Sequence, residues 1–320
     1  MDYLIDAELD GKTVLELMRS TLGLSRATIK HLKFKQKGIE VDGAHVTVRH
    51  VLRCGQTLSL ALEDTRSPET LTPCELDLHI AYEDEELVVP DKPADMPTHQ
   101  SFGHYGDTVA NALAYRYASM GIPFVFRPVN RLDRNTSGLL LIARDRVSAA
   151  YLSDAMKQRR ISKRYVAVLH GVLKENSGLI DTYMRRTAKS VIVREVCGEG
   201  EGGDRAITQY EVLCRGKEHT LVAATPITGR THQLRVHFAS LGCPIEGDDM
   251  YGDPSEHISR HALHSYILSF PHPSDGHMMT VTSALPEDML TLAKQVLGNA
   301  LDTLDESTKK TILPHKEEKI

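Results

Sequence analysis

The chain has 320 residues, of which 41% are hydrophobic and 25% charged, and its formal net charge at pH 7 is −5. These values are typical of ordinary globular proteins, and no apolar run approaches the roughly 20 residues that a membrane helix needs. The five cysteines lack Cys-x-x-Cys spacing, so we expect neither a disulfide framework nor a cysteine-based zinc site.

The N-terminal part, residues 1–62, predicts a small α/β domain. Its first residues lack the basic flank of a signal peptide, and we therefore expect a cytoplasmic protein. Ser25 precedes a pattern with helical spacing and is placed to act as the helix N-cap. The expected elements are a helix at residues 22–32, a strand and hairpin turn at 38–43, and an alternating strand at 57–62.

Residues 63–75 hold two prolines and no periodic pattern, which predicts a linker. A second domain is expected over residues 76–300. Its predicted strands are 87–89, 138–143, 165–169, 207–213 and 221–224, and its predicted helices are 108–118, 148–158, 231–241 and 287–297. Strands that alternate irregularly with helices indicate an α+β fold with a mixed or antiparallel sheet. Residues 301–320 predict a frayed C-terminal tail.

Basic residues gather in two segments, although the chain as a whole is acidic. The first segment holds Arg19, Arg26, Lys30, Lys33, Lys35, Lys37, Arg49 and Arg53, and the second holds Arg127, Arg131, Arg134, Arg144, Arg146, Lys157, Arg159, Arg160, Lys163 and Arg164. Few acidic residues interrupt either segment. This segregation favours a track for RNA, and a solvated helix face is the alternative for each segment taken separately.

The segment Arg131–Ala143 places a carboxylate, Asp133, between two arginines in a polar turn that leads into an apolar strand. Arg131 and Arg134 are expected to favour the ionised form of Asp133, which suits a nucleophile or a base. The alternative is an ordinary aspartate that opens a turn ahead of a buried strand.

Five segments resemble sequence blocks of the RluA-type pseudouridine synthases, and they occur in that family's order. These segments are Arg131–Ala143, Lys163–Tyr165, Gly229–His237, Pro244–Asp248 and His261–His264. The resemblance covers about residues 76–286. It implies a catalytic domain with a curved, mainly antiparallel mixed sheet, and an enzyme that isomerises uridine to pseudouridine in RNA without a cofactor or a metal.

The resemblance also implies roles for individual residues. It makes Asp133 catalytic, pairs Arg235 with it, and places Tyr165 against the target base. Substrate-binding residues are expected at Arg131, Arg134, Thr136, Lys163, Arg230, His232 and Gln233. Within this set, Arg131 is expected to fill the gap left by an extruded base, and Arg230 to contact a phosphate.

Helical spacing supports the placement of Arg235. In the predicted helix 231–241, Thr231 is expected to act as the cap, and Leu234, Phe238 and Leu241 form an apolar stripe beside Arg235. The alternative for Arg235 is a surface arginine that covers apolar side chains with its stem. For Tyr165, an aromatic residue in a strand, the alternative is a simple core residue.

Residues 1–62 resemble the S4 RNA-binding domain, so the expected partner is structured RNA. An S4-like module favours large-subunit ribosomal RNA as the substrate, and a tRNA uridine is the alternative. We expect a monomer that does not bind membranes.

The chain departs from the family pattern at two positions. Asn130 stands where many relatives have His, so we assign no acid or base role there, and Asp95 stands where Gly is usual. The histidines at 261, 264 and 272 lack convincing metal-ligand spacing and are expected to be structural or to line the cleft.

Two other classes of function fit parts of the pattern. One is a catalytically idle RNA-binding or ribosome-assembly factor, against which the joint presence of Asp133, Tyr165 and Arg235 argues. The other is a glycoside hydrolase, which generally requires a second positioned carboxylate that the sequence near Asp133 lacks.

Overall fold

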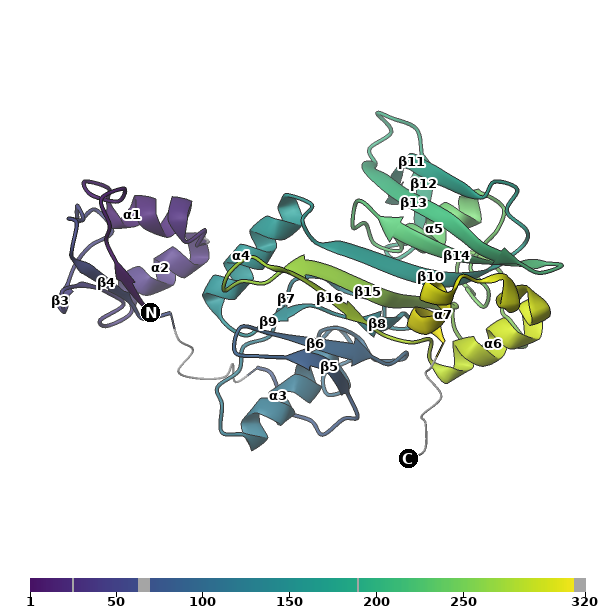
Figure 1. Ribbon diagram of the computed structural model, residues 1–320, viewed down its shortest axis with the longest axis horizontal. Helices are drawn as coiled ribbons and strands as arrows, with labels where there is room; N and C mark the ends of the chain where they lie inside the picture. Colours follow the sequence, from purple (N-terminus) through teal and green to yellow (C-terminus); the bar gives the residue numbers. More distant parts are fainter. Residues whose placement is uncertain (25, 63–69, 189, 314–320) are drawn as a thin grey trace.

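A computed structural model of the chain describes residues 1–24, 26–62, 70–188 and 190–313 (Figure 1). The N-terminal region comprises β1 (Asp2–Leu4), α1 (Val14–Glu16), the π-helix η1 (Leu17–Thr21), α2 (Arg26–Phe34), β2 (Ile39–Val41), β3 (Ala44–His45) and β4 (Thr57–Leu60). Its strands form an antiparallel sheet in the order β1-β4-β2-β3.

The sequence identified the main elements of this region. Asp42 and Gly43 have positive φ angles of 51° and 78°, which suits a two-residue hairpin between β2 and β3. The predicted helix is present as α2 but ends two residues later, at Phe34. The predicted cap, Ser25, lies outside the described residues, as do residues 63–69 of the predicted linker.

Residues 1–62 enclose a hydrophobic core of their own, built from buried aliphatic side chains such as Leu17, Leu32 and Leu58. Val147 and Ala150 of α4 (Arg146–Lys157) pack against this core. The N-terminal region therefore contacts the rest of the molecule through α4, beside which it lies in Figure 1.

The second region is organised around one large sheet. Its elements are β5 (His79–Glu83), β6 (Leu87–Lys92), α3 (Val109–Ser119), β7 (Arg127–Pro128), β8 (Ser137–Leu139), β9 (Ile142–Ala143), α4, β10 (Ser162–His170), β11 (Ser177–Arg186), β12 (Arg194–Cys197), β13 (Asp204–Arg215), β14 (His219–Pro226), α5 (Gln233–Ser240), β15 (Leu263–Pro271), β16 (Met278–Thr282), α6 (Glu287–Leu297), η2 (Gly298–Thr303) and α7 (Glu306–Ile312). Among the described residues twelve strands form the sheet, in the order β12-β11-β13-β14-β10-β15-β8-β6-β9-β7, with β16 on β15 and β5 on β6.

The pairings are antiparallel except for β8 with β15, which run parallel. The predicted α+β fold with a mainly antiparallel mixed sheet is therefore confirmed. Successive residues of β6 alternate between two cores, because side chains in a strand point to opposite faces. Val88 faces the core that contains α3 and α6, and Leu87 and Val89 face the core covered by α4.

The prediction of a frayed tail from residue 301 is wrong as far as residue 313. Leu304 and Ile312 are buried in the main core, and the amide of Leu285 donates to the carbonyl of Ile312 at 2.8 Å. Glu306 and Lys310 lie on the exposed side of α7, whose N-cap is Asp305. Residues 314–320 lie outside the described residues.

None of the helices in the described ranges has the length and hydrophobicity of a membrane span.

Gly138 shows why the Thr-Ser-Gly sequence after Asp133 ends in glycine. Its φ is +109°, and a Cβ there would lie 2.3 Å from the carbonyl oxygen of Ser265 on the neighbouring β15. No side chain fits between the two strands at this point. The parallel pairing of β8 with β15, which anchors the Asp133 turn, therefore requires glycine.

We predict that Gly138→Ala destabilises the protein by about 3 kcal/mol, because it adds an overlap with backbone to an unfavourable φ. Gly200→Ala is the matched control, since Gly200 has φ +82° but open space around its Cβ position. It should cost only about 1 kcal/mol. Urea unfolding of both variants measures the difference, and equal losses would contradict the steric explanation.

Candidate active site

Asp133 lies in the turn between β7 and β8, and the backbone of that turn is held tightly. The amide of Thr136 donates to the carbonyl of Asp133 at 3.1 Å. The Thr98 hydroxyl donates to the carbonyl of Leu132 at 2.9 Å and accepts from its amide at 3.2 Å. A single side chain thus satisfies both backbone groups of the residue before Asp133, which limits how the carboxylate can move.

A buried lysine supports the backbone of the same turn. Lys92, at the end of β6, is fully buried, and its ammonium donates to the carbonyls of Pro93 at 2.7 Å and Arg134 at 2.8 Å. Burial lowers the pKa of Lys92 to about 7, and the Arg260 guanidinium acts in the same direction. Sequence reasoning did not assign this residue a role, although a lysine that ends an apolar strand is itself unusual.

Two histidines form hydrogen bonds with the polar side chains that follow Asp133. His261 Nε2 lies 2.8 Å from the Thr136 hydroxyl, and His264 Nδ1 lies 2.9 Å from the Ser137 hydroxyl. Burial lowers the pKa of each ring to about 3, so both are neutral at physiological pH. Thr136, predicted to bind substrate, lines the cleft but is almost fully buried and engages His261. The third histidine, His272, lies at the end of β15 and outside the cleft.

A cleft of about 470 Å³ opens over this turn. It runs between the turn, the start of β10, the end of β14 and the segment that leads into α5. The predicted residues that line it are Arg131, Asp133, Thr136, Lys163, Tyr165, Arg230, His232, Gln233 and Arg235. The structure therefore brings together residues that are up to about a hundred positions apart in the chain, and Arg134 is absent from that lining.

Arg134 leans away from the cleft. Its guanidinium lies 2.5 Å from the carboxylate of Asp95, and both side chains are exposed. Asp95 itself has φ +62°, a left-handed conformation that explains why glycine is usual at this position. Arg134 thus pairs with Asp95, and its expected effect on Asp133 and its expected contact with the substrate stay predictions.

Arg235 is the cation that faces Asp133, but its strongest partner is a different acid. Its Nη1 lies 3.8 Å from Asp133 Oδ2, whereas its Nε and Nη2 donate to Asp248 at 2.7 and 2.8 Å. Asp248 is fully buried, and the Arg235 guanidinium keeps the pKa of that carboxyl below its usual value against the effect of burial. The bidentate pair fixes the guanidinium and leaves one nitrogen directed at Asp133.

His232 is a second neighbour of Asp133. Its Nε2 lies 3.9 Å from Asp133 Oδ2, and its Nδ1 lies 2.8 Å from the hydroxyl of Tyr251. The ring of Tyr251 also lies 5.0 Å from the Arg235 guanidinium carbon. Sequence reasoning missed Tyr251 and Asp248 as site residues, although Asp248 ends one of the quoted family blocks.

The start of α5 differs from the prediction. The helix begins at Gln233 with His232 as N-cap, and His232 has φ 58° and no side-chain cap bond, so Thr231 is not the cap. Gln233 closes the turn instead. Its Oε1 accepts from the amide of Arg230 at 3.0 Å and from the hydroxyl of Thr228 at 2.7 Å. The left-handed backbone conformation of His232 directs its own ring toward the cleft.

Gln233 and Leu241 also differ from expectation. The amide nitrogen of Gln233 donates to the carbonyl of Ile207 and the hydroxyl of Thr208, both at 2.9 Å, so its polar atoms are engaged within the protein. Leu241 is 43% exposed, and the buried stripe of α5 consequently ends at Phe238.

Tyr165 lies in β10, where the register with β15 shifts between Arg164 and Tyr165. Its ring is buried and lines the cleft. Burial raises the pKa of Tyr165 far above its usual value, and the negative charge of Asp133 acts in the same direction. The phenol is therefore protonated at neutral pH and is available for stacking and for donating a hydrogen bond.

Asn130 and Arg230 complete the predicted set. The side-chain oxygen of Asn130 accepts from the amide of Leu141 at 2.8 Å, a structural contact that needs no titratable group. Arg230 is exposed at the edge of the cleft, where its Nη1 lies 3.4 Å from the carboxylate of Asp204.

Asp133, Tyr165 and Arg235 thus share one cleft across a mainly antiparallel sheet, which is the arrangement implied by the resemblance to the RluA-type pseudouridine synthases. Comparison with known proteins agrees. The family model described as RNA pseudouridylate synthase matches residues 86–240. The chain belongs to the RluA-type family of RNA pseudouridine synthases, and it is an isomerase.

Individual relatives cover most of the chain. A Bacillus subtilis protein called uncharacterized RNA pseudouridine synthase YjbO is 37% identical over 85% of this chain and 95% of its own length. The ribosomal large subunit pseudouridine synthase D of Pseudomonas aeruginosa is 33% identical over 81% of this chain and 83% of its own length. The solved structure of human RNA pseudouridylate synthase domain containing 1 is 29% identical, with a TM-score of 0.57, over 74% of this chain and 97% of that one.

We predict that Arg235→Gln lowers the free energy of unfolding by about 3–5 kcal/mol, because it leaves the Asp248 carboxylate buried without its cation. Arg205→Gln is the matched control. Arg205 makes a similar bidentate contact with Asp181, at 2.8 and 2.5 Å, but on the exposed surface. It should cost less than about 1 kcal/mol. Urea unfolding would contradict the argument if both variants lost the same stability.

Proposed function

We propose that Asp133 is the catalytic carboxylate and that the substrate is a uridine of large-subunit ribosomal RNA. The observation that carries the assignment of Asp133 is its position in the cleft. Its carboxylate lies 3.8 Å from Arg235 Nη1, and Tyr165 lines the same space. An aspartate that only opened a turn would not need to share a cleft with a buried cation and a buried phenol.

The chemistry of the isomerisation requires one such carboxylate. The N1–C1′ bond of the uridine breaks, the uracil rotates, and a C5–C1′ bond forms. The proton at C5 is lost and N1 gains one, so that atoms and charge balance without a cofactor. Asp133 acts either as the nucleophile at C1′ or as the base that removes a sugar proton, and both routes use its ionised form.

The surrounding side chains have distinct proposed tasks. Arg235, anchored on Asp248, orients Asp133 and places a positive charge 3.8 Å from its carboxylate. Tyr165 holds the detached base against its ring, because its neutral phenol offers a stacking face. The target base must first leave its stack, which costs a few kcal/mol. Arg131 is exposed beside Asp133 and is proposed to fill the gap that the base leaves.

We predict that Asp133→Asn lowers tritium release from C5-labelled uridine RNA by more than about 10³-fold while RNA affinity changes little, because the amide is neither a nucleophile nor a base. Asp95→Asn is the control, since Asp95 lies beside the same turn but outside the cleft lining. It should retain most of the activity. Turnover by Asp133→Asn at the rate of the control would remove Asp133 from the mechanism.

The Asp133→Asn variant can also be used to identify the substrate RNA in cells. Pseudouridines are mapped in total RNA from cells that lack the gene and carry either the wild-type gene or Asp133→Asn. The proposal expects a site in large-subunit ribosomal RNA that only the wild-type gene restores. A site restored in tRNA alone would establish the alternative substrate.

Two observations support ribosomal RNA as the substrate. The relatives from Pseudomonas aeruginosa and Nitrosomonas europaea are both called ribosomal large subunit pseudouridine synthase D. The N-terminal region carries exposed basic residues on and around α2, with Lys30, Lys33 and Lys37 among them. We propose that this region is an S4-like module that binds structured RNA by its shape and backbone charge.

We predict that the triple variant Lys30→Gln, Lys33→Gln, Lys37→Gln weakens RNA binding and reduces the slope of log affinity against log salt by up to about 2–3, because each lysine can neutralise one phosphate. The rate on saturating RNA should stay within about twofold, since the cleft is unchanged. The control replaces Lys174, Lys217 and Lys294, which are exposed elsewhere. Equal salt slopes for the two triple variants would refute the RNA-binding role of α2.

A further inference from the structure

Three potential metal ligands meet on the sheet outside the catalytic cleft. His170 is the last residue of β10, His219 is the first residue of β14, and Glu246 belongs to the segment that leads to Asp248. None of the three lines the cleft around Asp133. Along β10, His170 lies five residues beyond Tyr165, a distance of roughly 17 Å for an extended strand.

Strand pairing creates this cluster. His170 and His219 are direct partners in the antiparallel register of β10 and β14, so their side chains share one face of the sheet. Their ring centroids lie 5.2 Å apart with an interplanar angle of 87°. The arrangement leaves His170 Nδ1 and His219 Nε2 on either side of a common carboxylate oxygen.

Glu246 supplies that oxygen. Its Oε2 lies 3.1 Å from His170 Nδ1 and 3.2 Å from His219 Nε2, and the three atoms all lie within 4.8 Å of one another. A tetrahedral zinc ion with bonds of about 2.0–2.2 Å has ligand atoms about 3.3–3.6 Å apart. The two nitrogen–oxygen distances are therefore already close to those that such an ion requires.

The backbone around the three residues is rigid. The amide of His170 donates to the carbonyl of Pro244 at 2.8 Å, and the amide of Glu246 donates to the carbonyl of Val168 at 2.9 Å. Leu169 and Ile245 form a β-bridge between these contacts. All three ligands lie on neighbouring segments whose backbones are hydrogen-bonded to one another. Little conformational entropy is therefore lost when the ligands coordinate an ion.

We propose that His170, His219 and Glu246 form a zinc site that fastens the segment Pro244–Asp248 to the ends of β10 and β14. Two imidazoles and one carboxylate suit zinc and related transition metals, whereas Mg²⁺ and Ca²⁺ prefer ligands that are all oxygen. The side chains of His219 and Glu246 are 12% and 8% exposed, and that of His170 is 63% exposed. An ion can thus enter past His170 and keep water as its fourth ligand.

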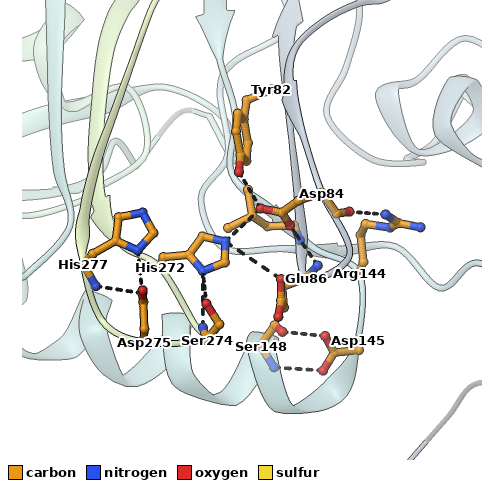
Figure 2. Close-up of polar contacts among 11 residues, drawn as sticks. Tyr82, Asp84, Glu86, Arg144, Asp145, Ser148, His272, Ser274, Asp275 and His277 are labelled. Carbon is orange, nitrogen blue, oxygen red and sulfur yellow. Dashed lines mark hydrogen bonds and ion pairs between the residues drawn. The ribbon is translucent and has the colours of Figure 1, made fainter.

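The expectation that the chain binds no metal was based on the family resemblance and on the spacing of His261, His264 and His272. Of these, His272 does lie close to acidic groups, but it is committed to hydrogen bonds (Figure 2). Its Nε2 lies 2.8 Å from Asp84 Oδ2, which also accepts from the Tyr82 hydroxyl at 2.7 Å. Its Nδ1 accepts from the amide of Ser274 at 3.3 Å. Coordination there would break contacts with Tyr82 and Ser274, which are not ligands, whereas the contacts that Glu246 Oε2 makes with His170 and His219 are among the proposed ligands themselves.

The position of the site suggests a structural rather than a chemical task. Glu246 is two residues before Asp248, which anchors the Arg235 guanidinium. An ion held by Glu246 would restrain the segment that presents Asp248. The ion would stabilise the fold and would take no part in the isomerisation.

The test uses the full chain, stripped of metal with a chelator and titrated with ZnCl₂ in a calorimeter. We expect one equivalent to bind and the unfolding midpoint to rise by roughly 5 °C at a hundredfold excess over Kd. Bound Co²⁺ in place of zinc should show the intense absorption of a tetrahedral ion. His170→Ala and Glu246→Gln should each lower the affinity by at least about tenfold.

His277→Ala is the matched control, because His277 is an exposed histidine beside the competing cluster in Figure 2. It should bind zinc as the wild type does. The proposal is overturned if no equivalent binds, if His170→Ala binds zinc unchanged, or if His277→Ala alone loses the ion. His170 is largely exposed, so its alanine variant should fold, and the measurement remains decisive whether or not Asp133 has the role proposed above.

Discussion

The buried ion pair between Arg235 and Asp248 is the interaction on which the active site depends. A guanidinium removed from water is costly unless its donors are matched by acceptors, and Asp248 matches two of them at 2.7 and 2.8 Å. With those donors engaged, the remaining nitrogen is held 3.8 Å from Asp133. The cleft therefore contains a fixed positive charge beside the carboxylate, and no side chain has to reorganise to supply it.

The side chains that hold the turn around the Asp133 carboxylate are neutral, apart from Lys92, which donates to the carbonyl of Arg134. Thr98 satisfies the backbone of Leu132, and the neutral rings of His261 and His264 engage Thr136 and Ser137. Neutral partners leave the charge of Asp133 to be balanced by Arg235 and the neighbouring cleft cations. The turn is thus rigid without additional acids that would compete for the arginine.

Helix α4 connects the two regions of the molecule. Val147 and Ala150 near its start pack on the N-terminal core, and Met156 and Arg159 near its end line the cleft. RNA that contacts the basic surface of the N-terminal region would reach the cleft along this helix. Some basic residues of the predicted track serve the fold instead, since the guanidinium of Arg144 lies 4.9 Å from the ring centroid of Tyr117.

The sequence by itself determined the class of fold, the carboxylate proposed as catalytic and most of the residues that share its cleft. Asp133, Tyr165 and Arg235 could be found because each lies in a short block whose residue types and order carry the family pattern. Alternating and helical spacing likewise located α2, β2, β4 and α5, since burial of one face imposes that spacing.

Only the tertiary structure decided which groups those residues contact. Asp248 proved to be the main partner of Arg235, Lys92 to support the turn, and Asp95 to bind Arg134, because such contacts join segments that are distant in the chain. His232 replaced Thr231 as the α5 cap because Gln233 closes the turn through its side chain. The C-terminal helix α7 resembles a tail in sequence because Ile312 is its one apolar residue, and that side chain is buried only by packing on the main core.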